Sequence, residues 1–366
     1  MQHIDLIINA RWIVPIRPKN TVLEHASVVV HHGKIIDVLS QADCAVQFSA
    51  DKTIERPTGV LMPGLINAHT HASMSLLRGY ADDLPLMQWL TEYIWPAEAK
   101  WVDENFVELG AQLAILEMIK GGTTCFNDMY FCPDVVGKVA QQSGIRASLG
   151  MIVIDFPTVW AQNADEYLSK GMAVQDTFKH NSRIQTAFAP HAPYTVSDAP
   201  LEKIRMYADE LDVQIHMHIH ETAHEVEESL ENFGVRPLAR LDQLGLLSPR
   251  MQAVHLTQLL DDEIETLANR GVHAIHCPQS NMKLASGASP VVQMQSAGIN
   301  LALGTDGASS NNDLDMFAEM QSAALLAKNT TLQADAFPAF DALEAATLGG
   351  AKALAMDEVT GSLEAG

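Results

Sequence analysis

Cationic residues and cysteines are scarce in this sequence. Its 366 residues include 23 lysines and arginines against 45 aspartates and glutamates, which gives a net charge of -22. A chain this acidic is unsuited to binding a nucleic-acid backbone or an anionic membrane, but small uncharged ligands remain open to it. The four cysteines form no Cys-x-x-Cys pair, so neither a disulfide framework nor a zinc knuckle is expected. We expect reduced, mostly buried thiols at Cys44, Cys125, Cys132 and Cys277.

Long hydrophobic runs and targeting signals are also missing. No apolar stretch is long enough to span a membrane. The N-terminus, Met1-Gln-His-Ile-Asp5, lacks the basic and apolar regions of a secretory signal, so we expect a cytoplasmic protein with no membrane partner. Hydrophobic residues make up 47% of the chain and charged residues 19%, which is typical of a globular protein with a large core.

The first 58 residues read as a small β module. His32-Gly33 is expected to form a tight hairpin turn between two of its strands. The runs with strand character are Asp5–Asn9, Arg11–Ile16, Ala26–Val30 and Lys34–Leu39.

From about residue 60, strand-like runs alternate eight times with helical stretches. This alternation predicts an α/β protein with a (β/α)8 TIM-like barrel. An open doubly wound sheet is the alternative, but no glycine-rich phosphate loop supports it. The strand-like runs are Leu61–His71, Thr123–Met129, Arg146–Ile154, Ile184–Pro193, Val213–Glu221, Met251–Thr257, His273–Asn281 and Ile299–Gly307. Helices are expected over Phe106–Lys120, which reads as amphipathic, and over Ser197–Leu211, Asp261–Arg270, Phe317–Ala327 and Ala339–Leu354.

These patterns divide the chain into three parts. The β module covers residues 1–58, and the barrel covers residues 59–358. Residues 359–366 are expected to begin a return to the β module.

The first barrel strand ends in the sequence His69-x-His71. Residues two apart on a strand point to the same face, so these two imidazoles would lie side by side. They could share one metal ion, or they could be two hydrogen-bonded core histidines. The rest of the chain has to supply the further ligands.

Polar residues follow most of the other barrel strands. In a barrel, functional side chains cluster at the carboxyl ends of the strands. Histidines with one aspartate make a mononuclear site of nitrogen and oxygen ligands, which suits Zn²⁺ or Fe²⁺. No lysine ends these strands near the cluster, so nothing suggests a bridged two-metal site. The polar residues are His191, His216, His218, His220, Glu221, His255, His276 and Asp306.

The fifth barrel strand leaves a choice open. His216, His218 and His220 alternate along it and therefore share one face. Only one of them need bind the metal, and alternation does not decide which.

The sequence resembles the amidohydrolase superfamily, and within it the 5′-methylthioadenosine/S-adenosylhomocysteine deaminases. The resemblance covers nearly the whole chain. The stretch Trp95-Pro-x-Glu98 and the pair Pro190-His191 narrow it to adenosine-type substrates. The motifs shared with other members are Pro63-Gly-Leu-Ile-Asn-Ala-His-Thr-His71, Met87-Gln-Trp-Leu90, His218-x-x-Glu221, His276-Cys-Pro-x-Ser-Asn-x-Lys-Leu-Ala-Ser-Gly287 and Gly304-Thr-Asp-Gly-x-x-Ser-Asn-Asn312.

The resemblance implies a role for each matching residue. Glu221 would be the general acid/base, and His255 would position the attacking water. Glu98 and His191 would hold the nucleoside, with Glu98 on the ribose hydroxyls, and Glu221 and Asp306 would also contact the substrate. The metal ligands would be His69, His71, His218 and Asp306.

The implied reaction is hydrolytic deamination of 5′-methylthioadenosine to the inosine analogue and ammonia. S-adenosylhomocysteine and adenosine are further candidate substrates. One Zn²⁺ per subunit, with Fe²⁺ as the alternative, would make a hydroxide available at neutral pH for attack on C6. Asp306 would take the proton of the water, and Glu221 would protonate ring nitrogen N1. The resemblance also implies a homo-oligomer.

Two features depart from the family pattern. Family members that take S-adenosylhomocysteine often carry arginines beyond the third barrel strand, but here no arginine lies between Arg146 and Arg183. This favours the uncharged methylthio substrate. Family chains also usually continue past Leu-Glu-x-Gly with strands that complete the N-terminal module. We therefore expect the C-terminal half of a small β-sandwich to be absent from this chain, which ends at Gly366.

Two other functions compete with this interpretation. Another enzyme of the superfamily would act on a triazine, as a chlorohydrolase or aminohydrolase, or on guanine. A flat base without ribose has no use for a carboxylate at Glu98 that binds a diol. A non-catalytic barrel would need no activated water and hence no Glu221 beside the ligand set.

Overall fold

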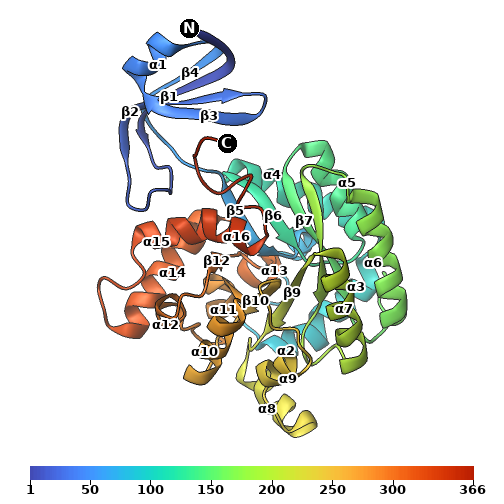
Figure 1. Ribbon diagram of the computed structural model, residues 1–366. Helices are drawn as coiled ribbons and strands as arrows, with labels where there is room; N and C mark the ends of the chain where they lie inside the picture. The colour runs from blue at the N-terminus through green and yellow to red at the C-terminus, as the bar shows by residue number, and fades with distance from the viewer. The chain divides into compact units, whose positions relative to one another are not determined.

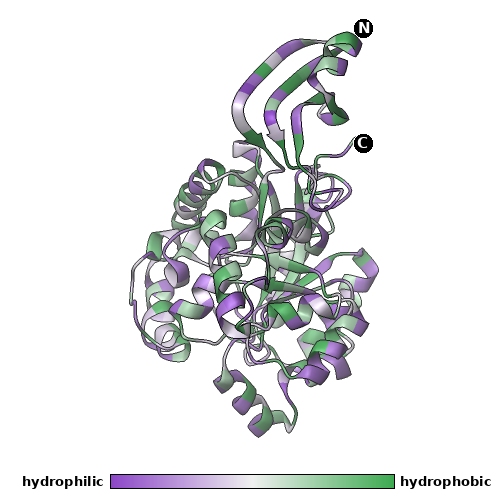
Figure 2. Ribbon diagram, turned by 90° about the vertical axis from the view of Figure 1, so that its left-hand side faces the viewer, coloured by the Kyte–Doolittle hydropathy of each residue, from purple (hydrophilic) through white to green (hydrophobic).

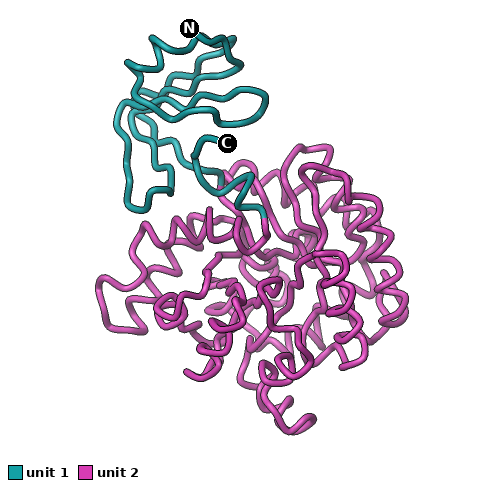
Figure 3. The backbone as a smooth tube through the Cα atoms, in the orientation of Figure 1, with its two compact units in different colours: residues 1–64, 356–366 teal, residues 65–355 magenta.

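The computed structural model describes residues 1–366, which form two compact units. Figure 3 colours the first unit, residues 1–64 and 356–366, in teal. The second unit is residues 65–355, in magenta.

The first unit is built on one mixed sheet of four strands in the order β3-β2-β1-β4. β2 pairs antiparallel with both β1 and β3, while β4 pairs parallel with β1. The predicted strands Asp5–Asn9 and Arg11–Ile16 are wrong as two elements, because the chain runs through Ala10 as a single strand. The elements are β1 (Gln2–Ile13), β2 (Leu23–His31), β3 (Lys34–Ser40), α1 (Gln41–Gln47) and β4 (Phe48–Leu61).

The sheet is the small N-terminal module that the sequence predicted. The hairpin turn is also confirmed, because His32 and Gly33 have φ angles of 50° and 75°, as a type I′ turn requires. The C-terminal segment belongs to this unit, where Leu363 packs against the cluster around Ile13. The amide of Leu363 donates to the carbonyl of Pro15 at 3.0 Å.

The second unit is a barrel of eight parallel strands surrounded by helices, as Figure 1 shows. Each strand pairs with the next in chain order, so the predicted (β/α)8 architecture is confirmed. Its strands are almost entirely buried, which explains why they read as apolar runs. They are β5 (Leu65–Thr70), β6 (Thr123–Asp128), β7 (Arg146–Val153), β8 (Ile184–Pro190), β9 (Gln214–Ile219), β10 (Met251–His255), β11 (His273–His276) and β12 (Leu301–Leu303).

The first barrel strand is shorter than predicted. The expected run Leu61–His71 is broken at Met62-Pro63-Gly64, where the chain leaves β4 and enters β5 at Leu65. Pro63 has no N–H to give to a strand ladder, so the strand cannot continue through it. His71 lies one residue beyond the end of β5.

The barrel closes between β5 and the segment after β12. The amide of Asp306 donates to the carbonyl of His69 at 3.0 Å. Asn67 adds two bonds to Thr305, one to its amide at 3.0 Å and one to its hydroxyl at 2.8 Å. A Cβ at Gly304 would lie 2.8 Å from the backbone nitrogen of His69, so only glycine allows this close approach. Closure therefore brings two predicted metal ligands together.

The outer helices carry bands of hydrophobic and hydrophilic residues in Figure 2, as helices packed on a barrel do. No helix is long and apolar enough to cross a lipid bilayer. One prediction is wrong in detail: α4 is not amphipathic, because Leu109, Leu113 and Leu116 are exposed opposite its buried face. The helices before β9 are η1 (Ala72–Leu77), α2 (Leu86–Gln88), η2 (Trp89–Ile94), α3 (Trp95–Trp101), α4 (Glu104–Lys120), α5 (Pro133–Ser143), α6 (Ala164–Phe178) and α7 (Asp198–Leu211). Those after β9 are α8 (Ala223–Phe233), α9 (Pro237–Gln243), α10 (Asp261–Arg270), α11 (Pro278–Lys283), α12 (Val291–Ser296), α13 (Ala308–Asn311), α14 (Met316–Thr331), α15 (Ala339–Glu344), η3 (Ala345–Gly349) and α16 (Gly350–Ala353).

Candidate metal centre and active site

The four predicted metal ligands converge at the carboxyl ends of the barrel strands. The Oδ1 atom of Asp306 lies 3.3 Å from Nε2 of His69 and 3.2 Å from Nε2 of His71. Nε2 of His218 lies 3.2 Å from Nε2 of His69. The four side chains come from the ends of β5 and β9 and from the segment after β12.

The backbone fixes the orientation of two of these imidazoles. Nδ1 of His71 lies 2.5 Å from the carbonyl oxygen of Met129, and Nδ1 of His218 lies 2.7 Å from that of His191. A carbonyl can only accept, so both Nδ1 atoms carry the proton. When each ring is neutral, its Nε2 atom therefore presents a lone pair to the cluster.

The orientation of His69 is set by a hydrogen bond with another histidine. Its Nδ1 lies 2.8 Å from Nε2 of His216, and both rings are fully buried. Burial lowers the pKa of His69 to about 4 and holds that of His216 well below its ordinary value. Both imidazoles are therefore neutral at pH 7, the form in which histidine binds a metal. The two histidines on β9 have different places: His216 orients a ligand and His218 faces the cluster, while His220 lies just beyond the end of the strand.

The Asp306 carboxylate is also held in place. Ser280 donates its hydroxyl to Oδ2 at 2.6 Å, and the amide of Gly307 donates to Oδ1 at 2.8 Å. Burial alone would raise the pKa of Asp306, but hydrogen bonds from His69 and His71 hold it well below its ordinary value. Asp306 is therefore ionised. Its φ of 63° lies in the left-handed region, which aspartate adopts more readily than most residues other than glycine.

These four side chains fit a divalent metal ion. Lone pairs of neutral imidazoles and a carboxylate repel one another unless a cation lies among them. Separations of 3.2 to 3.3 Å between ligand atoms are close to the edge, about 3.4 Å, of a tetrahedron with metal–nitrogen distances near 2.1 Å. Burial lowers the pKa of His71, but Asp306 outweighs it and raises that pKa to about 9. A cation beside Asp306 would compete with this proton.

Glu221 and His255 lie beside the ligand cluster. Nε2 of His255 is 3.7 Å from Oε2 of Glu221, and both side chains are buried. The other nitrogen of His255, Nδ1, lies 2.8 Å from Oδ1 of Asn281. Burial raises the pKa of Glu221, which favours a carboxyl group that can donate a proton.

Glu225 is a site residue that the sequence analysis did not identify. Its side chain is 3% exposed and accepts the backbone amides of His220 at 2.9 Å and Glu221 at 2.8 Å. These bonds hold the peptide between His220 and Glu221 in place. The backbone of His220 is left-handed there, with a φ of 54°. The signal was an acidic residue in the first turn of α8, where Thr222 caps the helix. That signal does not distinguish a solvated carboxylate from a buried one.

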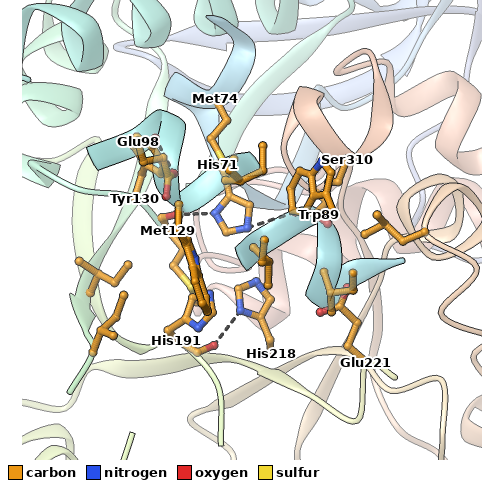
Figure 4. A pocket seen from close by; sticks show the side chains of 18 of the residues that line it. His71, Met74, Trp89, Glu98, Met129, Tyr130, His191, His218, Glu221 and Ser310 are labelled. Atoms are coloured by element: carbon orange, nitrogen blue, oxygen red, sulfur yellow. Dashed lines mark hydrogen bonds and ion pairs between the residues drawn. The ribbon is translucent and has the colours of Figure 1, made fainter. Parts of the chain in front are cut away.

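A cavity with about 650 Å³ of space, part of it open to solvent, is lined by His71, His218 and Asp306 of the ligand cluster. Figure 4 shows Glu98 with Tyr130 at one end of it and Glu221 at the other, with His71 and His218 between them. His191 also lines the cavity and contacts the hydroxyl of Thr195 through Nδ1 at 3.0 Å. Burial lowers the pKa of His191 to about 3, so it is a neutral donor or acceptor. All the predicted site residues therefore lie in or beside one cavity.

The remaining histidines near these strands lie outside the cavity. His220 is buried and its Nε2 accepts the amide of Leu238 at 3.2 Å, a structural contact. His276 is buried in the barrel, whereas His224 is exposed on α8.

Comparison with known proteins places this chain among related enzymes. The family model described as "Amidohydrolase family" matches residues 60–366. A 5-methylthioadenosine/S-adenosylhomocysteine deaminase from Saccharophagus degradans is 49% identical over 362 residues, which cover 99% of this chain and 81% of the relative. A 5′-deoxyadenosine deaminase from Methanothermobacter thermautotrophicus is 43% identical over 338 residues, 92% of this chain and 78% of the relative.

A solved structure gives the same result. The crystal structure of an adenosine deaminase from Xanthomonas campestris with bound zinc superposes with a TM-score of 0.99. Its sequence is 53% identical, and the match covers 100% of this chain and 83% of that chain.

Proposed function

The chain belongs to the amidohydrolase family, and we propose that it is a zinc-dependent deaminase of 5′-methylthioadenosine, with S-adenosylhomocysteine and adenosine as further candidate substrates. The chemical basis of this activity would be a divalent-metal site formed by His69, His71, His218 and Asp306, whose ligand atoms converge. The finer assignments, Zn²⁺ at one per chain and a homo-oligomer, stay proposals. They are supported by the zinc-bound relative and by the family resemblance.

One observation carries the proposal: two buried carboxylates lie at opposite ends of one cavity, with the metal ligands between them. Glu221 is next to the ligand cluster, where a purine ring would react. Glu98 is at the far end, where it could accept from ribose hydroxyls. A flat base would occupy the first position and leave Glu98 unused, so the arrangement favours a nucleoside.

The residues around the reacting carbon divide the proton transfers between them. A bound metal ion would supply the Lewis acid that lowers the pKa of a water molecule toward neutrality. His255, held by Asn281, and the ionised Asp306 would orient the water above C6 of the purine. Asp306 would accept the proton that the water loses on attack.

Glu221 would act on ring nitrogen N1, which is bonded to the reacting carbon C6. Burial raises the pKa of Glu221, which favours the protonated carboxyl group that would donate to N1 as the water adds. Glu225 would keep this carboxyl group in position by accepting hydrogen bonds from the backbone amides of His220 and Glu221. The bond from C6 to the exocyclic nitrogen then breaks. Ammonia leaves with the proton that Asp306 received, and the C6 hydroxyl returns a proton to Glu221 as it becomes the carbonyl group of the product.

The cavity around Glu98 suits an uncharged 5′-substituent. Trp95 and Phe131 line it there, and Phe156 packs edge-on against Trp95 with ring centroids 5.5 Å apart. No lysine or arginine lines the cavity. Lys170 and Lys179, which lie between Arg146 and Arg183, are instead paired with acidic residues of their own helix at 2.8 Å.

We therefore expect kcat/KM for 5′-methylthioadenosine to exceed that for S-adenosylhomocysteine by at least about tenfold. The reason is that the amino-acid carboxylate of the second compound would find no cationic partner. Steady-state kinetics with both compounds, measured on one preparation, gives the ratio. Comparable values of kcat/KM for the two compounds would contradict this preference.

Assays with base-only substrates test the proposal against its alternatives. Ammonia release should be fast with 5′-methylthioadenosine and slow with guanine. Chloride or amine release from a triazine should be at background. Fast turnover of guanine or of the triazine, with none of the nucleoside, would replace the proposed substrate while keeping the amidohydrolase chemistry.

A further inference from the structure

Tyr130 makes a contact that the proposed mechanism does not use. Its hydroxyl donates to Oε1 of Glu98 at 2.8 Å. Tyr130 lies two residues beyond the end of β6, and Glu98 lies on α3, so the bond joins two separate elements at the cavity. Tyr130 is 3% exposed and Glu98 9% exposed. Figure 4 shows the two side chains together at the end of the cavity away from Glu221.

Glu98 is a buried carboxylate with no lysine or arginine beside it. Tyr130 is the side chain that hydrogen-bonds to it, and no lysine or arginine lines the cavity. Burial raises the pKa of Glu98 to about 7, while the hydrogen bond from Tyr130 opposes that rise. Loss of this donor would raise the pKa of Glu98 further and remove a contact that holds the carboxyl group in place.

The hydrogen bond leaves a defined set of acceptor sites on Glu98. An ionised carboxylate offers about four lone-pair positions, two on each oxygen. Tyr130 takes one position on Oε1, so Oε2 and the remaining position on Oε1 stay free. Two adjacent hydroxyls on one ring need acceptors side by side, which is what the two oxygens of a fixed carboxylate provide.

We propose that Tyr130 is a positioning residue that sets the preference for ribose, by holding the Glu98 carboxylate so that it accepts from two neighbouring hydroxyls of the substrate. This inference rests on the proposed nucleoside substrate. It adds a residue that touches the binding group rather than the reacting atoms. The purine end of the cavity, with Glu221, does not depend on it.

The test compares Tyr130→Phe with the wild type on two substrates. 5′-Methylthioadenosine has both ribose hydroxyls, and 2′,3′-dideoxyadenosine has neither. In the variant, KM for the first should rise about tenfold, because Glu98 loses the hydrogen bond that holds it for the ribose hydroxyls. The kcat should stay within about twofold, because the reacting atoms are not affected. Both constants for the second should stay within about twofold. Phenylalanine keeps the ring, so packing against Phe131 is retained.

A matched control and a second variant keep the test decisive. Tyr207→Phe removes a phenol hydroxyl from α7, where the ring stacks on Phe188, and should change neither substrate. In a Glu98→Gln background, Tyr130→Phe should cause no further rise in KM. Inhibition constants of inosine and 2′,3′-dideoxyinosine give the same contrast without turnover.

The outcomes separate this inference from the proposed function. Equal losses on both substrates, or no change on either, would overturn the role of Tyr130 while leaving the deaminase intact. A wild-type enzyme that turns over neither nucleoside would overturn the proposed substrate, and this inference with it.

Discussion

Replacing Glu221 with glutamine is expected to lower kcat on 5′-methylthioadenosine by about a hundred- to ten-thousandfold. The amide has the shape of the carboxyl group but cannot exchange a proton with N1 of the purine. Glu221 lies 3.7 Å from His255 and outside the ligand set, so metal content should stay at the wild-type value. Stopped or continuous ammonia assays beside metal analysis of the same sample measure both quantities.

A matched variant shows whether the effect is specific. Glu227→Gln makes the same change at an exposed position on α8, six residues further along, and should leave kcat unchanged. The thermal midpoint of Glu221→Gln should stay near that of the wild type, since the substitution creates no cavity. Full activity in Glu221→Gln would show that another group donates the proton.

Removal of the metal is expected to abolish the reaction and to destabilise the barrel. Dialysis against a chelator should lower kcat by at least about a thousandfold, because the water loses its Lewis acid. The thermal midpoint should fall by several degrees, since an ion that binds only the folded chain stabilises it. Adding Zn²⁺ back should restore both properties. Calorimetry, metal analysis and the ammonia assay measure the thermal midpoint, the metal content and kcat before chelation, after it and after Zn²⁺ is returned.

Substitution of a single predicted ligand should lower both the metal content and the activity. His218→Ala should purify with little metal and little activity, because its Nε2 is one of the atoms that converge on the site. His180→Ala removes an exposed histidine after α6 and should retain both. A His218→Ala protein with full metal content would remove this residue from the ligand set.

The ligands could be predicted from the sequence because they are tied to strand ends. His69, His71 and His218 follow apolar runs whose burial the barrel requires, and parallel strands bring their carboxyl ends to one rim. Family resemblance then selected His218 on β9. The roles of these residues remain predictions, although their convergence is a property of the structure.

Other features depend on tertiary contacts that no local pattern carries. Glu225 reads as one acid in an acidic helix turn, yet it is buried against two backbone amides. Tyr130 reads as an aromatic core residue, and its bond to Glu98 depends on how α3 lies over the end of β6. The predicted strand Leu61–His71 ran through Pro63, because the apolar pattern did not show that the chain passes there from one compact unit to the other.

The central claim is that this chain adds water to C6 of a purine nucleoside and releases ammonia. The most direct test runs the reaction with 5′-methylthioadenosine in ¹⁸O-labelled water and analyses the products by mass spectrometry and ammonia assay. The account predicts an inosine analogue with one labelled oxygen at C6 and an equal amount of ammonia. Release of free adenine, or an unchanged nucleoside in the presence of one metal ion per chain, would contradict it.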